Sequence, residues 1–230
     1  MKLLKQSSQI LFCDPYLLNL IELAGRTCYK SESKISSDSH KIFIKNILSR
    51  KHESVIEHSL LSVKFITDRG ISHEIVRHRL CSFSQESSRY VNYSKQGCQF
   101  IIPFWYTNIC DNIDEVNQYL TQNWNIDEIS IACNLDDTEK MFLKYLSNGE
   151  KMYNQLISAG QKPEQARAVL PTCTKTEIVV SANFREWRHI FRLRMSSKAH
   201  PQIQELMLDL YNKLRVEYPE IFEIMFIDIL

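Results

Sequence analysis

The chain has 230 residues, 44% of them hydrophobic, and its 28 basic and 27 acidic side chains give a formal net charge of +1. This apolar content offsets the conformational entropy of the chain and excludes a mainly disordered protein, and the length supports a full core without disulfide or metal staples. The near-neutral balance argues against a general nucleic-acid-binding protein, which carries a strong basic excess.

The cysteines and the apolar segments indicate where the protein works. There are seven cysteines, an odd number, and none forms a C-x-x-C pair. This pattern is typical of free thiols in a reducing compartment rather than of a disulfide framework. The N-terminal segment lacks the apolar run of a signal peptide, and no segment reaches the roughly 18 apolar residues that cross a bilayer. We therefore expect a cytoplasmic protein with no membrane partner.

The first half of the chain predicts a mixture of helices and strands. Apolar side chains at helical spacing predict helices over residues 16–29 and 39–51. Alternation of apolar and polar residues from 59 to 68 predicts a half-buried antiparallel strand. The next expected elements are a short helix over 70–79 and strands over 90–94 and 99–102.

The second half begins with a polar stretch, residues 103–137, that we expect to be a variable and irregular surface region. A long helix is predicted from Thr138 to Ala159, with Asp137 as its cap and Gly160 as its stop. The later expected elements are a short helix from Pro163, a strand over 176–180, a helix from Asn183 through Arg194 that opens on a capping box with Glu186, and a helix over 201–216. Helices and strands do not alternate regularly, which favours an α+β fold with a mainly antiparallel sheet flanked by helices.

Two clusters of basic residues stand out in this neutral chain. One holds Arg77, Arg79 and Arg89, and the other lies between Arg185 and Arg194, with Arg167 upstream. The planar guanidinium grips phosphates and carboxylates at two points, so the clusters predict a specific anionic ligand such as a nucleotide. The alternative is that these arginines form surface ion pairs with the glutamates at 53, 57, 74 and 186.

Other kinds of site have weaker support. The histidine pairs at 52 and 58 and at 73 and 78 lack the spacing that stacks two ligands on one helical face, so we expect no metal site. The sequence has no G-x-G-x-x-G or Walker motif. Cys81 and Cys173 lie near cations that favour a reactive thiolate, but free cysteines are more often inert buried hydrophobes, and we favour that interpretation.

One string is more specific than these patterns. Arg77-His78-Arg79, followed after seven residues by Ser87, resembles the RHR-x7-S signature of the flavin-dependent thymidylate synthases. The segment from His52 to His58 resembles the upstream motif of that family. Three further segments resemble family segments in the same order: ARAVLP (166–171), NFREWRH (183–189) and LRMSSKAH (193–200).

The resemblance implies a reaction and an assembly. Members of the family methylate dUMP to dTMP, with methylenetetrahydrofolate as the carbon donor and with FAD that is reduced by NADPH. It implies one domain over residues 1–230 and a homotetramer whose sites are shared between subunits. Such an enzyme uses no thiol nucleophile, and no nucleic-acid partner is expected.

The resemblance also assigns roles to individual residues. It implies flavin contacts by these residues: Ser54, Arg77, His78, Arg79, Gln85, Asn183, Arg185 and His189. It implies nucleotide contacts by these residues: Glu74, Arg77, Gln85, Ser87, Ser88, Arg89, Arg167 and Arg194. Arg194 matches the catalytic arginine that faces the uracil, where a fixed cation stabilises the uracil anion and makes C5 more nucleophilic.

This chain departs from the family pattern at three of these places. Some members have Asn-Glu where this chain has Ser84-Gln85, Gln where it has Glu74, and Asn where it has His189. Gln85 carries no charge, so its position transfers but an acid–base role does not. Two alternatives to an active enzyme are a nucleotide-binding module without turnover and an RNA- or DNA-binding protein, and the intact Arg194 and Arg77-His78-Arg79 favour the enzyme.

Overall fold

The computed structural model describes residues 1–223, and the chain forms two compact units. Unit 1 contains residues 1–6, 66–75 and 85–178, and unit 2 contains residues 7–65, 76–84 and those from 179 onward. Because these segments interleave along the sequence, no single cut separates the units. One domain over the whole chain therefore stays a prediction.

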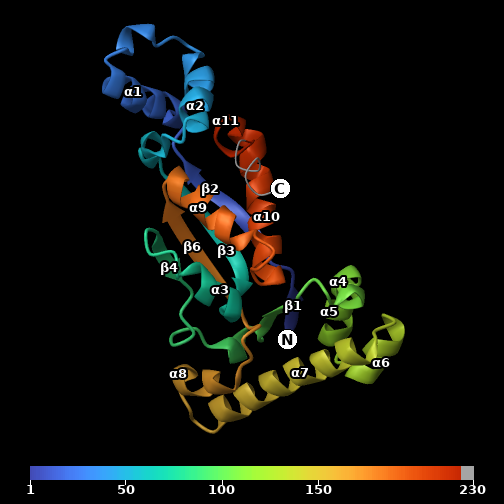
Figure 1. Cartoon of the computed structure of the whole chain (residues 1–230). Coiled ribbons are helices and arrows are strands. Elements are labelled where there is room, and N and C mark those ends of the chain that lie inside the picture. The colour runs from blue at the N-terminus through green and yellow to red at the C-terminus, as the bar shows by residue number, and fades with distance from the viewer. Residues whose placement is uncertain (224–230) are drawn as a thin grey trace. The chain divides into compact units, whose positions relative to one another are not determined.

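Within residues 1–223 the strands form two sheets, and most of them belong to one four-stranded antiparallel sheet (Figure 1). Its order is β2 (Ser7–Cys13), β3 (Leu61–Asp68), β6 (Lys175–Ala182) and β4 (Ser82–Gln85). Buried and partly exposed side chains alternate along β3 and β6, which is the period-two pattern of strands that cover a core. The predicted mainly antiparallel α+β class is confirmed, as are the strands expected near β3 and β6.

The second sheet pairs β1 (Lys2–Leu4) with β5 (Gln99–Ile101) in parallel, with Leu3 opposite Phe100. The strand expected over 99–102 is thus confirmed. The sequence did not predict β1, β2 or β4, because each is short or lacks clear alternation.

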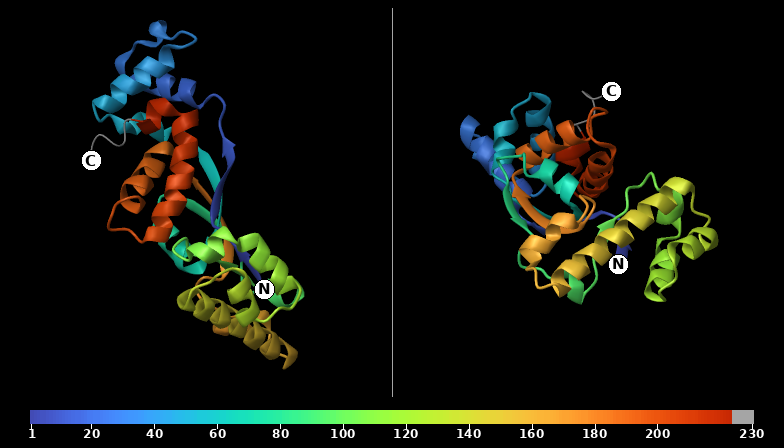
Figure 2. Two further views of the ribbon diagram at one scale, coloured as in Figure 1. Left: turned by 90° about the vertical axis from the view of Figure 1, so that its right-hand side faces the viewer. Right: turned by 90° about the horizontal axis from the view of Figure 1, so that it is seen from below.

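Unit 2 holds the helices that follow β2 and β6. They are α1 (Leu17–Tyr29), α2 (Ser39–Ser49), α9 (Phe184–Arg194), α10 (Pro201–Glu217) and α11 (Pro219–Phe222), with the 3₁₀ helices η1 (Glu32–Lys34) and η2 (Glu53–Glu57). Within this unit α10 packs against β2 and α9 (Figure 2). Phe184, Trp187 and Phe191 bury one face of α9, and Phe191 and Phe222 meet edge to face. The apolar side chains that predicted a helix over 201–216 are therefore the core face of α10, whereas Leu20 of α1 and Ile42 of α2, which belong to the predicted apolar spacing, are exposed.

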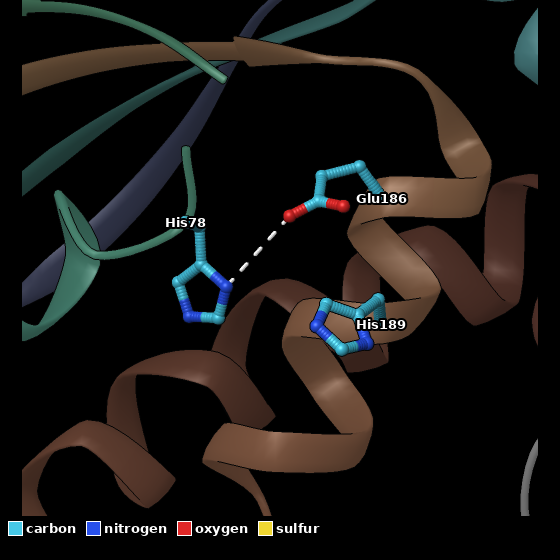
Figure 3. A group of neighbouring side chains, drawn as sticks. All are labelled: His78, Glu186 and His189. Atoms are coloured by element: carbon cyan, nitrogen blue, oxygen red, sulfur yellow. Dashed lines mark ion pairs between the residues drawn. The ribbon is translucent and has the colours of Figure 1, made fainter. Parts of the chain in front are cut away.

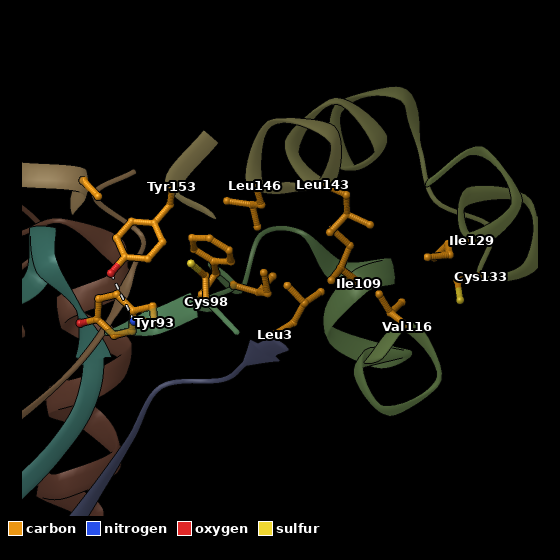
Figure 4. Close-up of a cluster of buried hydrophobic side chains, with 13 residues drawn as sticks. Leu3, Tyr93, Cys98, Ile109, Val116, Ile129, Cys133, Leu143, Leu146 and Tyr153 are labelled. Atoms are coloured by element: carbon orange, nitrogen blue, oxygen red, sulfur yellow. Dashed lines mark hydrogen bonds between the residues drawn. The ribbon is translucent and has the colours of Figure 1, made fainter. Parts of the chain in front are cut away.

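Unit 1 contains α3 (Arg69–Ile75), α4 (Thr107–Asp111), α5 (Ile113–Thr121), α6 (Ile126–Ala132), α7 (Asp137–Ser158) and α8 (Pro163–Ala166), with η3 (Tyr93–Lys95) and η4 (Arg167–Val169). Figure 4 shows the core of this unit, where α4 to α7 and both strands of the small sheet contribute side chains. The long helix predicted over 138–159 is confirmed, although Asp136 rather than Asp137 caps it. The Asp136 carboxylate accepts from the Glu139 backbone N–H, and the Glu139 carboxylate accepts from the Asp136 backbone N–H.

Three predictions for this part of the chain are wrong. Residues 103–137 are not irregular: α4, α5 and α6 bury Ile109, Val116 and Ile129 completely, and these apolar residues are too widely spaced among polar ones to show a stripe. Residues 90–94 form no strand, because Asn92 caps η3 and the buried Tyr93 packs on Tyr153. The helix expected over 70–79 ends at Ile75, and the following residues turn back, with Cys81 N donating to His78 O.

No helix among residues 1–223 combines the length and the apolar character that crossing a membrane requires.

Candidate functional site

The turn after α3 and the helix α9 bring three predicted site residues, His78, His189 and Arg194, together with Glu186 in unit 2. His78 is buried, and Figure 3 shows its ring directed toward Glu186 and His189 of α9. Arg194 Nε donates to His78 Nε2 at 2.9 Å, and His78 Nδ1 lies 3.7 Å from Glu186 Oε1. The helical repeat places Glu186, His189 and Arg194 along α9, so one helix supplies three of the four groups.

The protonation of His78 follows from these contacts. Burial, the Arg194 charge and His189 lower the pKa of His78 from 6.5 to about 4, so the ring is neutral at pH 7. Because Nε2 accepts the Arg194 N–H, the single ring proton resides on Nδ1 and faces Glu186. Burial also raises the pKa of Glu186. The 3.7 Å separation from Glu186 is longer than a hydrogen bond, so the contact that fixes the His78 tautomer is the one with Arg194.

His78, Glu186 and His189 also place potential metal-ligand atoms within 4.8 Å of one another. The His78 Nε2 lone pair is already used by Arg194, whose guanidinium opposes a second cation beside the same ring. The geometry therefore favours a role in holding Arg194 over a metal centre.

The other arginines of α9 are held by glutamates of η2. Arg185 pairs with Glu57, while Glu53 Oε1 accepts from Arg188 Nη2 at 3.1 Å and from Arg192 Nη2 at 2.7 Å. For Arg185 and Arg192 the alternative of surface ion pairs is confirmed, whereas Arg188 forms a buried ion pair. Arg185, which the resemblance assigns to the flavin, thus has a carboxylate partner in this structure.

A cavity of about 560 Å³ opens beside these pairs, within the size range of small-molecule sites. It is lined by Glu53, Glu57, Leu80, Asn183, Arg185, Glu186, His189 and Arg192. Asn183 also begins α9, where its Oδ1 accepts from Glu186 N at 2.9 Å. Of the predicted flavin residues, Asn183, Arg185 and His189 therefore line one polar cavity.

A second group of predicted site residues lies in unit 1, around the loop that follows β4. Gln85 Nε2 donates to Ser72 Oγ at 2.8 Å and to Thr176 Oγ1 at 3.2 Å. Ser88 is buried, and its Oγ accepts from Arg167 Nη1 at 2.8 Å. The structure thus brings the predicted Ser88 and Arg167 together from positions 79 residues apart.

The remaining predicted residues near this loop are more exposed. Ser87 O accepts from the backbone N–H groups of Tyr90 and Val91 and closes a turn. Arg89 is exposed and lies 3.6 Å from Glu164, and Glu74 is half-buried on α3. In unit 2, Ser54 of η2, Arg77 and Arg79 are also exposed.

Sequence reasoning missed Glu86, Lys175 and Tyr93, which surround the start of the same loop. Lys175 Nζ and Tyr93 Oη each donate to the Glu86 carboxylate at 3.0 Å. The available signal was Lys175, a cation in a strand rich in β-branched residues, but its partner Glu86 is 89 residues away and no local pattern identifies it.

The thiols do not have the environment of nucleophiles. Burial and the Glu186 carboxylate raise the pKa of Cys81 to about 12, and burial and Asp68 raise the pKa of Cys173 to about 12. The thiolate is therefore scarce at neutral pH, as expected for inert cysteines.

Comparisons with known proteins indicate the family of this chain. The family model described as thymidylate synthase complementing protein matches residues 14–220. The flavin-dependent thymidylate synthases of Corynebacterium glutamicum and Mycobacterium avium are each 33% identical to this chain over 213 and 211 residues, which cover 88% of it and 77% of each relative.

The fold is also similar to a solved structure. Thymidylate synthase X from Helicobacter pylori, crystallised with FAD and dUMP, superposes with a TM-score of 0.72 at 23% identity, over 96% of this chain and 98% of that one. The match to the family model covers most of the chain, and the relatives agree with it. This chain therefore belongs to the family of the flavin-dependent thymidylate synthases.

Proposed function

We propose that the protein is a thymidylate synthase that converts dUMP, methylenetetrahydrofolate and NADPH with a proton into dTMP, tetrahydrofolate and NADP⁺. Membership of the flavin-dependent thymidylate synthase family supports the methylation of dUMP as the class of reaction. The observation that carries the proposal is the arrangement of Arg194, which the buried and neutral His78 holds through a 2.9 Å hydrogen bond.

Arg194 acts on the pyrimidine in this proposal. Its guanidinium stabilises the negative charge that develops on the uracil when N3 loses its proton, which raises the electron density at C5. A cation in a fixed position does this better than a mobile one, because no reorganisation is needed at the moment of reaction. His78, whose Nε2 accepts from Arg194 Nε, supplies that fixed position.

The residues of the cavity fit FAD. Arg185 and Arg192 offer guanidinium donors for a diphosphate, Leu80 an apolar surface, and Asn183 and His189 polar groups for a ring system. The two carboxylates of η2 already neutralise arginines of α9, so they do not form an isolated acidic patch that would repel the phosphates. When bound, reduced FAD supplies the reducing equivalents for the methylation.

The nucleotide is assigned to the loop after β4. Ser87, Ser88, Arg89 and Arg167 provide hydroxyl and guanidinium donors of the kind that bind a phosphate. Arg167 and Ser88 already contact each other, which supports a preformed arrangement. Gln85, fixed by two hydroxyl groups, and Glu74 complete the nucleotide contacts in this proposal.

A homotetramer with sites shared between subunits is part of the proposal. Its support in the structure is the exposure of large apolar side chains in unit 2: Tyr16, Leu20, Leu23 and Ile42. Such exposed apolar surface is typical of interaction surfaces. We also infer a cytoplasmic location, where dUMP and the reduced cofactors are made.

The visible spectrum of the purified protein tests the cofactor assignment. We expect a flavin absorption band, either as purified or after FAD is added and free FAD is removed. Arg185→Ala should weaken flavin retention, while Lys213→Ala, a change in the same unit but outside the cavity, should not. A wild-type protein that retains no flavin under either condition would show that the proposal is wrong.

A further inference from the structure

Glu86, which comes directly before the proposed phosphate-binding loop 87–89, is held at four atoms. Its N–H donates to Glu177 O and its carbonyl oxygen accepts from Arg69 Nη2, both at 2.8 Å. Its carboxylate accepts from Tyr93 Oη through Oε1 and from Lys175 Nζ through Oε2, both at 3.0 Å. Backbone and side chain are therefore anchored together, so the direction in which the loop leaves β4 is fixed.

The charged groups in this anchor are largely shielded from solvent and lie in contact with one another. The Glu86 and Lys175 side chains are 16% and 11% exposed. Burial lowers the pKa of Lys175, but hydrogen bonds to Glu177 and Glu86 outweigh it and keep the pKa above its ordinary value. Burial and the Glu86 carboxylate raise the pKa of Tyr93 to about 12, so its hydroxyl remains a donor. A low local dielectric strengthens each of these hydrogen bonds.

The Glu86 carboxylate carries a negative charge next to residues that are proposed to bind a negatively charged phosphate. An unpaired Glu86 charge beside them would oppose that binding. The Lys175 ammonium compensates part of this charge at the distance of a direct hydrogen bond, and it also donates to Glu177 Oε1 at 2.6 Å. Lys175 lies on β6, an interior strand of the four-stranded sheet. The pair thus reduces the charge of Glu86 and ties the loop to a rigid element.

We propose that Glu86 and Lys175 form a positioning pair for the phosphate-binding loop, acting on substrate affinity through Ser87, Ser88 and Arg89 rather than by touching the substrate. This inference rests on the proposed function, since it requires dUMP to bind at the loop. The alternative is an ion pair that stabilises unit 1 and has no specific effect on the phosphate.

The phosphate itself separates these alternatives. Flavin-loaded Glu86→Gln, Lys175→Met and the double variant are titrated with dUMP and with deoxyuridine, which lacks the phosphate. In each single variant the affinity for dUMP should fall about tenfold, the loss expected for one charge-assisted hydrogen bond, and the affinity for deoxyuridine should stay within about twofold. The double variant should be no weaker than the weaker single variant, because both changes break the same interaction. Turnover at saturating dUMP should stay close to that of the wild type, so the loss appears in KM.

Lys213→Met provides the matched control. Lys213 also bridges a carboxylate and a second acceptor, Asp209 at 2.7 Å and Ser8 O at 2.7 Å, but in unit 2. Its affinity for dUMP should match that of the wild type. Flavin content is measured in every variant to verify that it is folded.

Two outcomes would overturn the role of the pair. One is unchanged dUMP affinity in both single variants, and the other is an equal loss for dUMP and deoxyuridine, which would indicate general destabilisation of unit 1. Wild-type protein that binds flavin but not dUMP would instead overturn the proposed function, and the pair's role with it.

Discussion

At the scale of single residues, Arg194 is the group on which the proposed chemistry depends. Arg194→Ala removes the cation that we propose stabilises the uracil anion, but it leaves the cavity beside α9 intact. We expect turnover to fall by about 10²–10³-fold, the usual loss when one preorganised charge donor is removed, with flavin still bound. Arg215→Ala, at an exposed arginine of α10, is the control and should retain full turnover. Near wild-type rates in Arg194→Ala would contradict the role given to this residue.

The lowered pKa of His78 leads to a second prediction for a single residue, which concerns how the stability of the protein depends on pH. The unfolded chain takes up a proton at His78 below its ordinary pKa of 6.5, whereas the folded protein does so only near pH 4. Acidification between these values therefore favours the unfolded state, by up to about 3 kcal/mol at 1.36 kcal/mol per pKa unit. Above pH 6.5 the ring is neutral in both states and contributes nothing to the slope.

The variant His78→Gln tests this, because glutamine keeps an acceptor for Arg194 but takes up no proton. Urea unfolding of the apoprotein from pH 4.5 to pH 7 should show a shallower loss of stability on acidification in the variant than in the wild type. Glu186, whose pKa is raised, gives a slope of the opposite sign in both proteins, and the comparison removes it. Identical slopes would contradict a buried, neutral His78.

The candidate site shows what could be predicted from residues alone. Local motifs named the residues of both groups, because the Arg77-His78-Arg79 string and the α9 segment are contiguous in sequence. The partners that hold them could not be predicted in the same way. Glu186 facing His78 and Lys175 facing Glu86 are pairs about 90 to 110 residues apart in the chain, and only the fold brings them together.

At the scale of elements, η2 and α9 are locked by charge. Arg188 is 3% exposed, and it donates to Ile221 O as well as to Glu53. Burial opposes ionisation of Glu53, yet its hydrogen bonds and charge interactions with Arg192 and Arg188 keep its pKa below the ordinary value. Removing the carboxylate would leave a buried guanidinium without its ion partner.

Glu53→Ala should therefore lower the free energy of unfolding by about 3 kcal/mol, the typical result of breaking one side of a buried ion pair. Lys41→Ala breaks the exposed pair with Asp38, at 3.5 Å, and should change stability by less than about 1 kcal/mol. Urea unfolding of both variants measures the difference. Equal stabilities would mean that this pair does not hold the two elements together.

The elements also show where sequence patterns succeed. Long helices such as α7 and α10 and the alternating strands β3 and β6 have enough repeats for their period to be recognised. The short helices α4, α5 and α6 offer one buried residue per turn or less, and their polar faces dominate the composition. Their clearest local signal was the capping box at Asn125 and Glu128, which the polar composition of residues 103–137 concealed.

At the scale of the whole molecule, the net charge of +1 reflects many basic side chains that are paired with acidic ones. Three arginines of α9 pair with the glutamates at 53 and 57, and Lys175 pairs with both Glu86 and Glu177. Arg194 donates to the His78 imidazole, and Arg167 donates to the Ser88 hydroxyl group. A chain whose basic side chains are balanced and paired in this way lacks the strong basic excess of a protein that binds a polyanion.

The central claim is that this chain makes dTMP, and one assay tests it most directly. Purified, flavin-loaded protein is incubated with dUMP, methylenetetrahydrofolate and NADPH, and dTMP is separated and quantified. We predict dTMP and tetrahydrofolate in equal amounts, with no product when either the flavin or NADPH is omitted. Flavin-loaded protein that binds dUMP and yet forms no dTMP would contradict the account and would describe a nucleotide-binding module instead.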